Sequence, residues 1–113
     1  MAARVGFSIR PEDKGDLAVF YCSGPLTLDH TETLKTEVRK WIAGRKRIAL
    51  DMREVERMDS SGIGAVIGLY ISAKRQNCEL ILINYGDSIR ELLGVTQLLG
   101  VFEAVGRTGG RLP

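Results

Sequence analysis

Hydrophobic and polar residues alternate with a period of two near the start of the chain. Apolar side chains occupy every second position in residues 5–9, and a second apolar run covers residues 17–22. This period predicts strands with one face on a core. Pro11 is predicted to end the first strand, and residues 12–16 to form a rather long loop. The opening of the chain therefore predicts an antiparallel hairpin at the edge of a sheet.

The period then changes to that of an amphipathic helix. Apolar residues recur every three to four positions between residues 34 and 42, with charged residues between them. Asp29 is the expected cap of this helix, and Glu32 follows it by three residues, as in a capping box. Gly44 is predicted to end the helix.

A second helix is predicted from Ser61 to about Gln76, with its apolar face formed by Ile63, Val66, Ile67, Tyr70 and Ile71. Three glycines in it each cost ~1 kcal/mol relative to alanine, so each needs a reason. We interpret Gly64 and Gly68 as sites where helix and sheet pack closely. For Gly62 two explanations stay open, close packing or the approach of a partner's backbone to the neighbouring serines.

The remaining pattern alternates strands with helices. Such alternation implies parallel pairing through right-handed crossovers. The expected fold class is α/β, a mixed sheet with an antiparallel edge hairpin plus parallel strands and with helices mainly on one face. We expect a single domain over residues 1–113, with its core at about 5–105 and a flexible tail at 106–113. The other expected elements are strands at 47–52, 80–83 and 101–105, a short helix from Asp87 interrupted at Gly94, and a helical turn at 96–100.

Composition and charge narrow the classes of function that the chain can have. The chain has 113 residues, 44% hydrophobic and 27% charged, which is ordinary for one globular domain. A net charge of +2 and one short basic cluster, residues 45–47, interpreted as a solvated loop, indicate neither nucleic-acid nor membrane binding. Cys22 and Cys78 are expected to be core residues in a reducing compartment. The N-terminus lacks an apolar signal core, so we expect a soluble cytoplasmic protein.

Catalysis is not indicated. A nucleophilic Ser60 or Ser61 would need a base, and His30, the sole histidine, lies at the predicted start of another helix, where we expect it to be exposed. The chain has no Gly-x-Ser-x-Gly elbow and no Gly-x4-Gly-Lys-Ser/Thr loop. Metal ligands do not occur at suitable spacing. We therefore expect no enzymatic activity, no cofactor and no metal.

The most informative stretch is Met-Asp-Ser-Ser-Gly-Ile-Gly at residues 58–64, where a helix is predicted to begin. Asp59 or Ser60 is the natural cap, because both side chains accept hydrogen bonds from a first turn. The stretch resembles the phosphorylation motif of STAS domains, in particular the bacterial anti-sigma factor antagonists. Similar local matches cover about residues 5–105, at 24–26, 48–51 and 89–93.

The resemblance implies a role for each motif residue. It assigns Ser60 as phosphoacceptor, Asp59 to orienting it, and Ser61 to capping the helix with a secondary acceptor role. The implied partners are an anti-sigma factor that is also a serine kinase, which binds the dephosphorylated form, and a metal-dependent serine phosphatase. The implied partner-binding residues are Gly24, Pro25, Leu26, Asp29, Asp59, Ser60, Ser61, Gly62 and Ile63.

The sequence departs from the family in one respect, and one alternative function stays open. The family usually adds a closing helix after its last strand, which residues 107–113 cannot form, so we expect exposed apolar surface that favours a homodimer. The alternative function is a non-catalytic STAS regulatory or scaffold subunit of a transporter, a lipid-transport complex or a stress-sensing assembly. Ser60 would then be an interface residue with no need of phosphorylation.

Simple charge arguments favour a switch of binding. A phosphate on Ser60 would add roughly −1.5 to −2 charges. Its attraction to the helix N-terminus, ~0.3–1 kcal/mol, is offset by repulsion from Asp59 of a comparable size. In an interface the same group would lose its water without a prepared counter-charge. Phosphorylation is therefore expected to break a contact and leave the fold intact.

Overall fold

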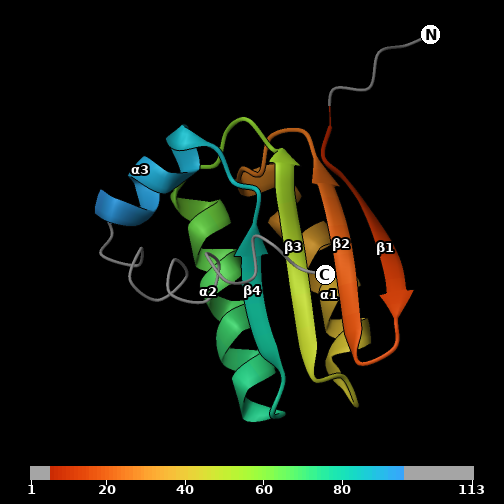
Figure 1. Ribbon diagram of the computed structural model, residues 1–113. Coiled ribbons are helices and arrows are strands. Elements are labelled where there is room, and N and C mark those ends of the chain that lie inside the picture. The colour runs from red at the N-terminus through yellow and green to blue at the C-terminus, as the bar shows by residue number, and fades with distance from the viewer. Residues whose placement is uncertain (1–5, 96–113) are drawn as a thin grey trace, which may run out of the picture.

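A computed structural model describes residues 6–95 of the chain (Figure 1). The strands form one sheet in the order β1-β2-β3-β4, in which β1 and β2 are antiparallel and the other neighbours are parallel. The fold class predicted from the sequence is confirmed. The elements are β1 (Ser8–Lys14), β2 (Leu17–Ser23), the 3-10 helix η1 (Leu28–His30), α1 (Thr31–Ile42), β3 (Arg47–Glu54), α2 (Ser60–Arg75), β4 (Glu79–Ile83) and α3 (Asp87–Val95).

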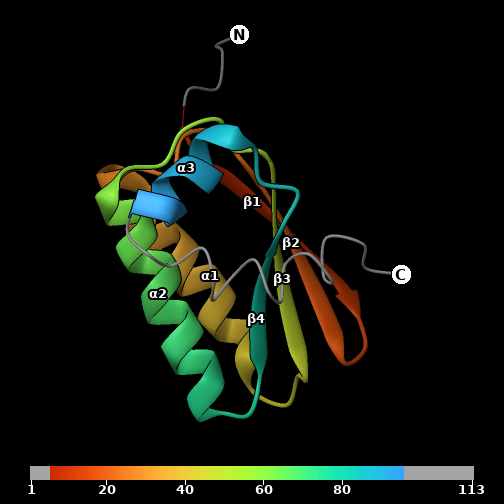
Figure 2. The same cartoon turned by 60° about the vertical axis from the view of Figure 1, so that its left-hand side comes forward.

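Helices α1 and α2 lie against the same face of the sheet (Figures 1 and 2). Because successive strand residues point to opposite faces, each strand contributes one set of side chains to each face. The inner set, represented by Phe20, Leu50 and Leu82, joins Val38 of α1 and Leu69 of α2 in the main core. The outer face of the sheet carries Leu17, Val19, Tyr21, Ala49, Ile81 and Ile83.

The hairpin differs from the prediction in two ways. Pro11 does not end β1 but lies within it, opposite Phe20. An edge strand pairs on one side only, so a residue without an N–H is tolerated there. The loop is short, since Lys14 pairs with Leu17 and only Gly15 and Asp16 connect the strands. Gly15 has φ of +79°, a conformation that glycine adopts without steric cost.

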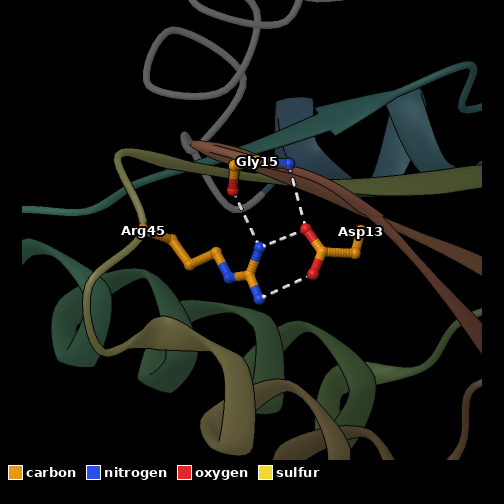
Figure 3. A network of polar contacts seen from close by, with 3 residues as sticks. All are labelled: Asp13, Gly15 and Arg45. Atoms are coloured by element: carbon orange, nitrogen blue, oxygen red, sulfur yellow. Dashed lines mark hydrogen bonds and ion pairs between the residues drawn. The ribbon is translucent and has the colours of Figure 1, made fainter.

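Arg45 ties this hairpin turn to the connection between α1 and β3 (Figure 3). Its guanidinium donates to both carboxylate oxygens of Asp13, at 2.6 and 3.3 Å, and to the carbonyl of Gly15 at 2.8 Å. These hydrogen bonds, with one from the Gly15 amide, hold the pKa of Asp13 below its usual value. Arg47 pairs with Glu79 at 2.9 Å. Lys46 and Arg47 are exposed, as a solvated loop predicts, but Arg47 already belongs to β3 and both arginines form ion pairs.

The start of the first helix was also predicted incorrectly. Asp29 is not a cap: it lies inside η1, and the residue before α1 is His30, with no side-chain capping hydrogen bond. The His30 amide donates to the Thr27 carbonyl at 2.8 Å, so this segment is wound into a tighter turn before the α-helix begins. The end was predicted better, since α1 stops at Ile42 and Gly44 follows with φ of +81°.

The later elements largely match the expected positions. Strand β3 continues two residues beyond the predicted 47–52, and α3 runs through Gly94, which does not interrupt it. Cys22 and Cys78 are buried and not disulfide-bonded, as expected of core residues. The predicted helical turn at 96–100, strand at 101–105 and tail at 106–113 fall outside the described residues. Between residues 6 and 95, no helix is long and apolar enough to cross a membrane.

Candidate functional site

The N-terminus of α2 is capped by Asp59. This residue has extended backbone angles, φ −106° and ψ −172°, and its carboxylate Oδ1 accepts from the Gly62 amide at 3.0 Å. Its carbonyl accepts from the Ile63 amide at 3.1 Å, which begins the helical ladder. Asp59 therefore satisfies an amide that a helix start leaves without an intrahelical partner. The capping role assigned to Ser61 is wrong, because Ser61 lies inside the first turn.

The first turn of α2 presents the two serines differently. Ser60 is exposed and Ser61 is half-buried, whereas Gly62 and Ile63 are buried. Residues two positions apart on an α-helix lie on nearly opposite sides of it. Because Gly62 is on the buried side, the Ser60 side chain points away from the core. Of the two hydroxyls, that of Ser60 is therefore the more accessible to another protein.

The segment from Gly24 to Asp29 lies beside this helix start. Leu26 forms an isolated parallel bridge with Met58, and its amide donates to the Arg57 carbonyl at 2.9 Å. The Asp59 amide in turn approaches the Leu26 carbonyl at 3.4 Å. The structure thus brings together the two predicted parts of the partner surface, residues 24–29 and 59–63. Leu26 and Ile63 are buried, so they support this surface from below.

Gly62 is required by the contact between these two segments. A Cβ there would overlap the Leu26 carbonyl oxygen and would lie 2.6 Å from Cγ of Met58. Close packing, one of the two explanations left open, therefore accounts for this glycine. Gly24 is also required, since its φ is +93° and a Cβ would lie 2.5 Å from the Gly6 carbonyl oxygen. The approach of a partner to Gly62 stays a prediction.

The other two glycines of α2 face outward. A Cβ at Gly64 or Gly68 would meet no atom within 4 Å, so the interpretation that they pack on the sheet is wrong. Ile71, predicted to lie on the buried face, is 46% exposed. Helical spacing places these residues on one side of α2 with Ser60 and the half-buried Ile67. We call this set the α2 surface: Ser60, Gly64, Ile67, Gly68 and Ile71.

Leu28 is a further exposed apolar residue that the sequence analysis missed. Its side chain is 69% exposed and lies in η1, which contacts α2. The sequence offers no periodic signal for it, because Leu28 lies between Thr27 and Asp29, two residues after the buried Leu26. A single exposed leucine is ordinary, and this one is of interest because η1 contacts α2.

The connector that leads to the site is fixed by polar contacts from two sides. The carboxylate of Asp51, a buried residue near the end of β3, accepts from the Arg53 amide at 2.9 Å and from the Asn84 side chain at 3.0 Å. Ser88 of α3 donates its hydroxyl to the Glu56 carbonyl at 3.0 Å. These contacts hold residues 53–58, and with them the position of Ser60.

His30, Cys22 and Cys78 are the other residues that could take part in nucleophilic chemistry. His30 is half-buried, not exposed as predicted, and its Nδ1 lies 3.4 Å from the Thr27 hydroxyl. Burial raises the pKa of Cys22 to about 12, so this thiol is protonated at neutral pH and a poor nucleophile. Among residues 6–95, no group of three His, Cys, Asp or Glu could hold a metal ion.

Comparison with known proteins identifies the family of this chain. The STAS domain model matches residues 8–110. The chain belongs to the STAS domain family. Anti-sigma-B factor antagonists of Listeria monocytogenes and Listeria innocua are each 32% identical to it over 56 residues, which is 50% of this chain and 49% of theirs. This STAS chain therefore spans about half the length of the curated relatives it matches.

Solved structures show the same STAS fold. The unphosphorylated form of the anti-sigma factor antagonist SpoIIAA has a TM-score of 0.74 at 21% identity, covering 94% of this chain and all of that one. The phosphorylated form of SpoIIAA from Bacillus has a TM-score of 0.68 at 21% identity, covering 84% and 87%. At these identities the likeness establishes the fold alone.

Proposed function

We propose that this STAS domain is an anti-sigma factor antagonist that acts by partner switching. It binds an anti-sigma factor serine kinase while Ser60 is unphosphorylated, and phosphorylation of Ser60 releases it. The observation that carries this proposal is the exposed Ser60 directly after the Asp59 cap. The curated relatives, which are anti-sigma-B factor antagonists, supply the class of partner.

The α2 surface is suited to such a partner because its five residues carry no charge, and the exposed Lys74 and Arg75 follow only in the last turn of α2. It consists of a serine, two glycines and two isoleucines, and the exposed Leu28 lies on the neighbouring η1. The small residues let another protein approach the helix backbone closely, while the isoleucines supply apolar area. The free energy of such a contact therefore comes mainly from the removal of apolar surface from water, with little contribution from attraction between charges.

A phosphate at Ser60 would oppose this contact. It adds roughly −1.5 to −2 charges at the edge of an apolar surface, next to the carboxylate of Asp59. Burying that charge without a counter-charge costs several kcal/mol, and about 1.4 kcal/mol is tenfold in affinity. Within the free protein the phosphate stays in water, so the fold is little affected. The switch thus acts on affinity.

The remaining roles follow from the same proposal. A metal-dependent serine phosphatase restores the binding form, and the protein itself catalyses neither step. Asp59 orients the acceptor through its fixed capping position, and Ser61 is a secondary acceptor. SpoIIAA, which shares the fold, has solved structures in an unphosphorylated and a phosphorylated form, and this supports phosphorylation of a domain of this kind.

The proposal is tested by incubating the protein with candidate anti-sigma kinases and ATP and mapping the phosphate by mass spectrometry. We expect modification at Ser60, its loss in Ser60→Ala and its retention in the matched variant Ser61→Ala. Phosphate at an undiminished level in Ser60→Ala, on Ser61 or elsewhere, contradicts the assignment of Ser60 as the principal acceptor. Binding of a transporter or scaffold subunit in a pull-down, without modification by any such kinase, would favour the alternative function.

A further inference from the structure

Asp51 is a charged side chain in the interior of the protein. It is 5% exposed, and it is the one buried residue that carries a charge among those that the structure describes. A buried carboxylate is tolerated where hydrogen bonds replace the water that it loses. Here one oxygen accepts from the Arg53 amide at 2.9 Å and the other accepts from the Asn84 side chain at 3.0 Å. Asp51 therefore joins the last residues of β3 to the residue that follows β4.

Asn84 is suited to this contact by its backbone as well as by its side chain. It directly follows β4 and has φ of +58°, a left-handed conformation that asparagine adopts more readily than most residues. Glycine would fit the same backbone but would offer no side-chain amide. Asn77, which lies before β4, has φ of +59°, and its side chain makes no hydrogen bond within residues 6–95. The hydrogen bond to Asp51 thus distinguishes Asn84 from an asparagine that only turns the chain.

The β4–α3 junction, residues 84–88, lies beside the connector between β3 and α2 (Figures 1 and 2). Ser88 donates its hydroxyl to the Glu56 carbonyl of this connector at 3.0 Å. A second segment holds the connector through the Gly24 amide, which donates to the Glu54 carbonyl at 3.0 Å. The connector is therefore fixed by two segments that are far from each other in sequence.

We propose that the β4–α3 junction, through Asn84 and Ser88, positions Ser60 for phosphorylation. The inference rests on the proposed function and adds to it residues outside the motif at 58–64. A phosphoryl acceptor must lie in line with the transferred group, and a displacement of about 1 Å can cost roughly 10²-fold in rate. The exposed Ser60 side chain makes no hydrogen bond within residues 6–95. Its place is therefore set by the backbone, by the first turn of α2 after it and by the connector before it.

Two asparagine variants give a matched test in the full chain. Asn84→Gly keeps the left-handed backbone and removes the hydrogen bond to Asp51, whereas Asn77→Gly keeps the same backbone at the other end of β4 and removes no such bond. Asn84→Gly should shift the amide resonances of residues 53–60 and raise hydrogen exchange of the Arg53 amide at least tenfold. Asn77→Gly should leave both unchanged. Equal behaviour of the two variants overturns the proposal.

The kinetics of phosphorylation separate positioning from folding. With an anti-sigma kinase that modifies the parent protein at Ser60, the double variant Asn84→Gly/Ser88→Ala should lower kcat at least tenfold. KM should change less than twofold, because the α2 surface is intact. Replacing Ser88→Ala by Ser88→Thr, which keeps a hydroxyl, should restore part of kcat. Each variant is assayed at a temperature where circular dichroism shows it to be folded, so that unfolded protein does not account for a loss.

The outcomes distinguish this inference from the proposed function. An unchanged kcat in the folded double variant, or a rise in KM alone, overturns the inference and leaves the proposed function standing. A parent protein that no anti-sigma kinase phosphorylates at Ser60 overturns both. If the double variant does not fold, the single variant Asn84→Gly decides, with Asn77→Gly as its control.

Discussion

The carboxylate of Asp59 accepts a hydrogen bond from the Gly62 amide at 3.0 Å, across the residue pair Ser60-Ser61. This bond fixes the first turn of α2 and leaves the Ser60 side chain exposed. The cap and the proposed phosphoacceptor are therefore different residues. A modification of Ser60 does not remove the hydrogen bond that begins the helix.

Asp59→Ala should destabilise the protein. Removal of an N-cap carboxylate costs about 0.5–2 kcal/mol in free energy of unfolding. Asp59→Asn is the matched control, because its amide oxygen still accepts from Gly62 and its loss should stay within a few tenths of a kcal/mol. Urea unfolding at pH 7 measures both. Equal stabilities of the Ala variant and the unmodified protein would show that the cap contributes nothing.

Alanine at the glycines of α2 should have opposite effects. Gly62→Ala should cost about 1–3 kcal/mol, because its Cβ would overlap the Leu26 carbonyl and force backbone shifts. Gly64→Ala and Gly68→Ala should stabilise by about 0.4–1 kcal/mol, since their Cβ atoms meet open space and alanine favours the helix. Thermal unfolding separates the two classes. A stabilising Gly62→Ala would contradict the close packing described above.

Ser60→Asp should separate binding from folding. The added charge should weaken the complex with the anti-sigma kinase at least tenfold, while the melting temperature stays within about 4 °C, the shift expected for a change of at most ~1 kcal/mol. Ser60→Ala should retain binding. Calorimetry gives affinity and melting temperature on the same samples. Marked unfolding of Ser60→Asp would mean that the serine controls the fold.

Ile71→Asp tests whether the α2 surface extends beyond the first turn. Ile71 is 46% exposed, so its replacement should change the free energy of unfolding by less than about 0.5 kcal/mol. Kinase affinity should fall at least tenfold, because a charge would enter an apolar contact. Thr36→Asp on α1, also at an exposed position, is the control and should bind normally. Equal affinities would limit the contact to the region around Ser60.

The Asp13–Arg45 pair should contribute to the pH dependence of stability. Its hydrogen bonds from Arg45 and Gly15 hold the pKa of Asp13 below the ordinary value of 3.8. The ionised form is thus favoured in the folded state, so the contribution is present above pH 3.8 and is lost as pH falls through the lower folded pKa. Asp13→Asn should be less stable than the unmodified protein at pH 7, with a smaller difference at pH 2. A constant difference would contradict this linkage.

Local patterns predicted most of the fold because each depends on residues close in sequence. The apolar run in residues 17–22, the helical period in 34–42 and the Asp-Ser-Ser-Gly helix start all specify structure within a few residues. Pro11 was misjudged because its tolerance depends on β1 being an edge strand, which only the assembled sheet determines. Asp29 has the right chemistry for a cap, but the tight turn at Thr27–His30 takes that position.

The arrangement at the start of α2 could be predicted from the sequence, but the exposed residues further along α2 and on η1 could not. The cap at Asp59 and the exposed position of Ser60 could be predicted because capping is local, whereas the role of Ser60 as phosphoacceptor stays a prediction. Gly68 and Ile71 were assigned to the buried side, since helical spacing alone does not say which side meets the sheet. Leu28 had no periodic signal at all. The α2 surface exists only once α2 has packed on its neighbours, so its members could not be separated from core residues in the sequence.

The bridge between Leu26 and Met58 affects how the α2 surface and Leu28 can change during evolution. The two segments are registered through main-chain hydrogen bonds, Leu26 to Arg57 and Asp59 to Leu26, which do not depend on the outward side chains. Substitution of Leu28 or Ile71 would therefore alter the shape and polarity offered to a partner without displacing Ser60. Duplicated copies of such a chain could diverge to recognise different kinases while keeping one geometry of phosphorylation.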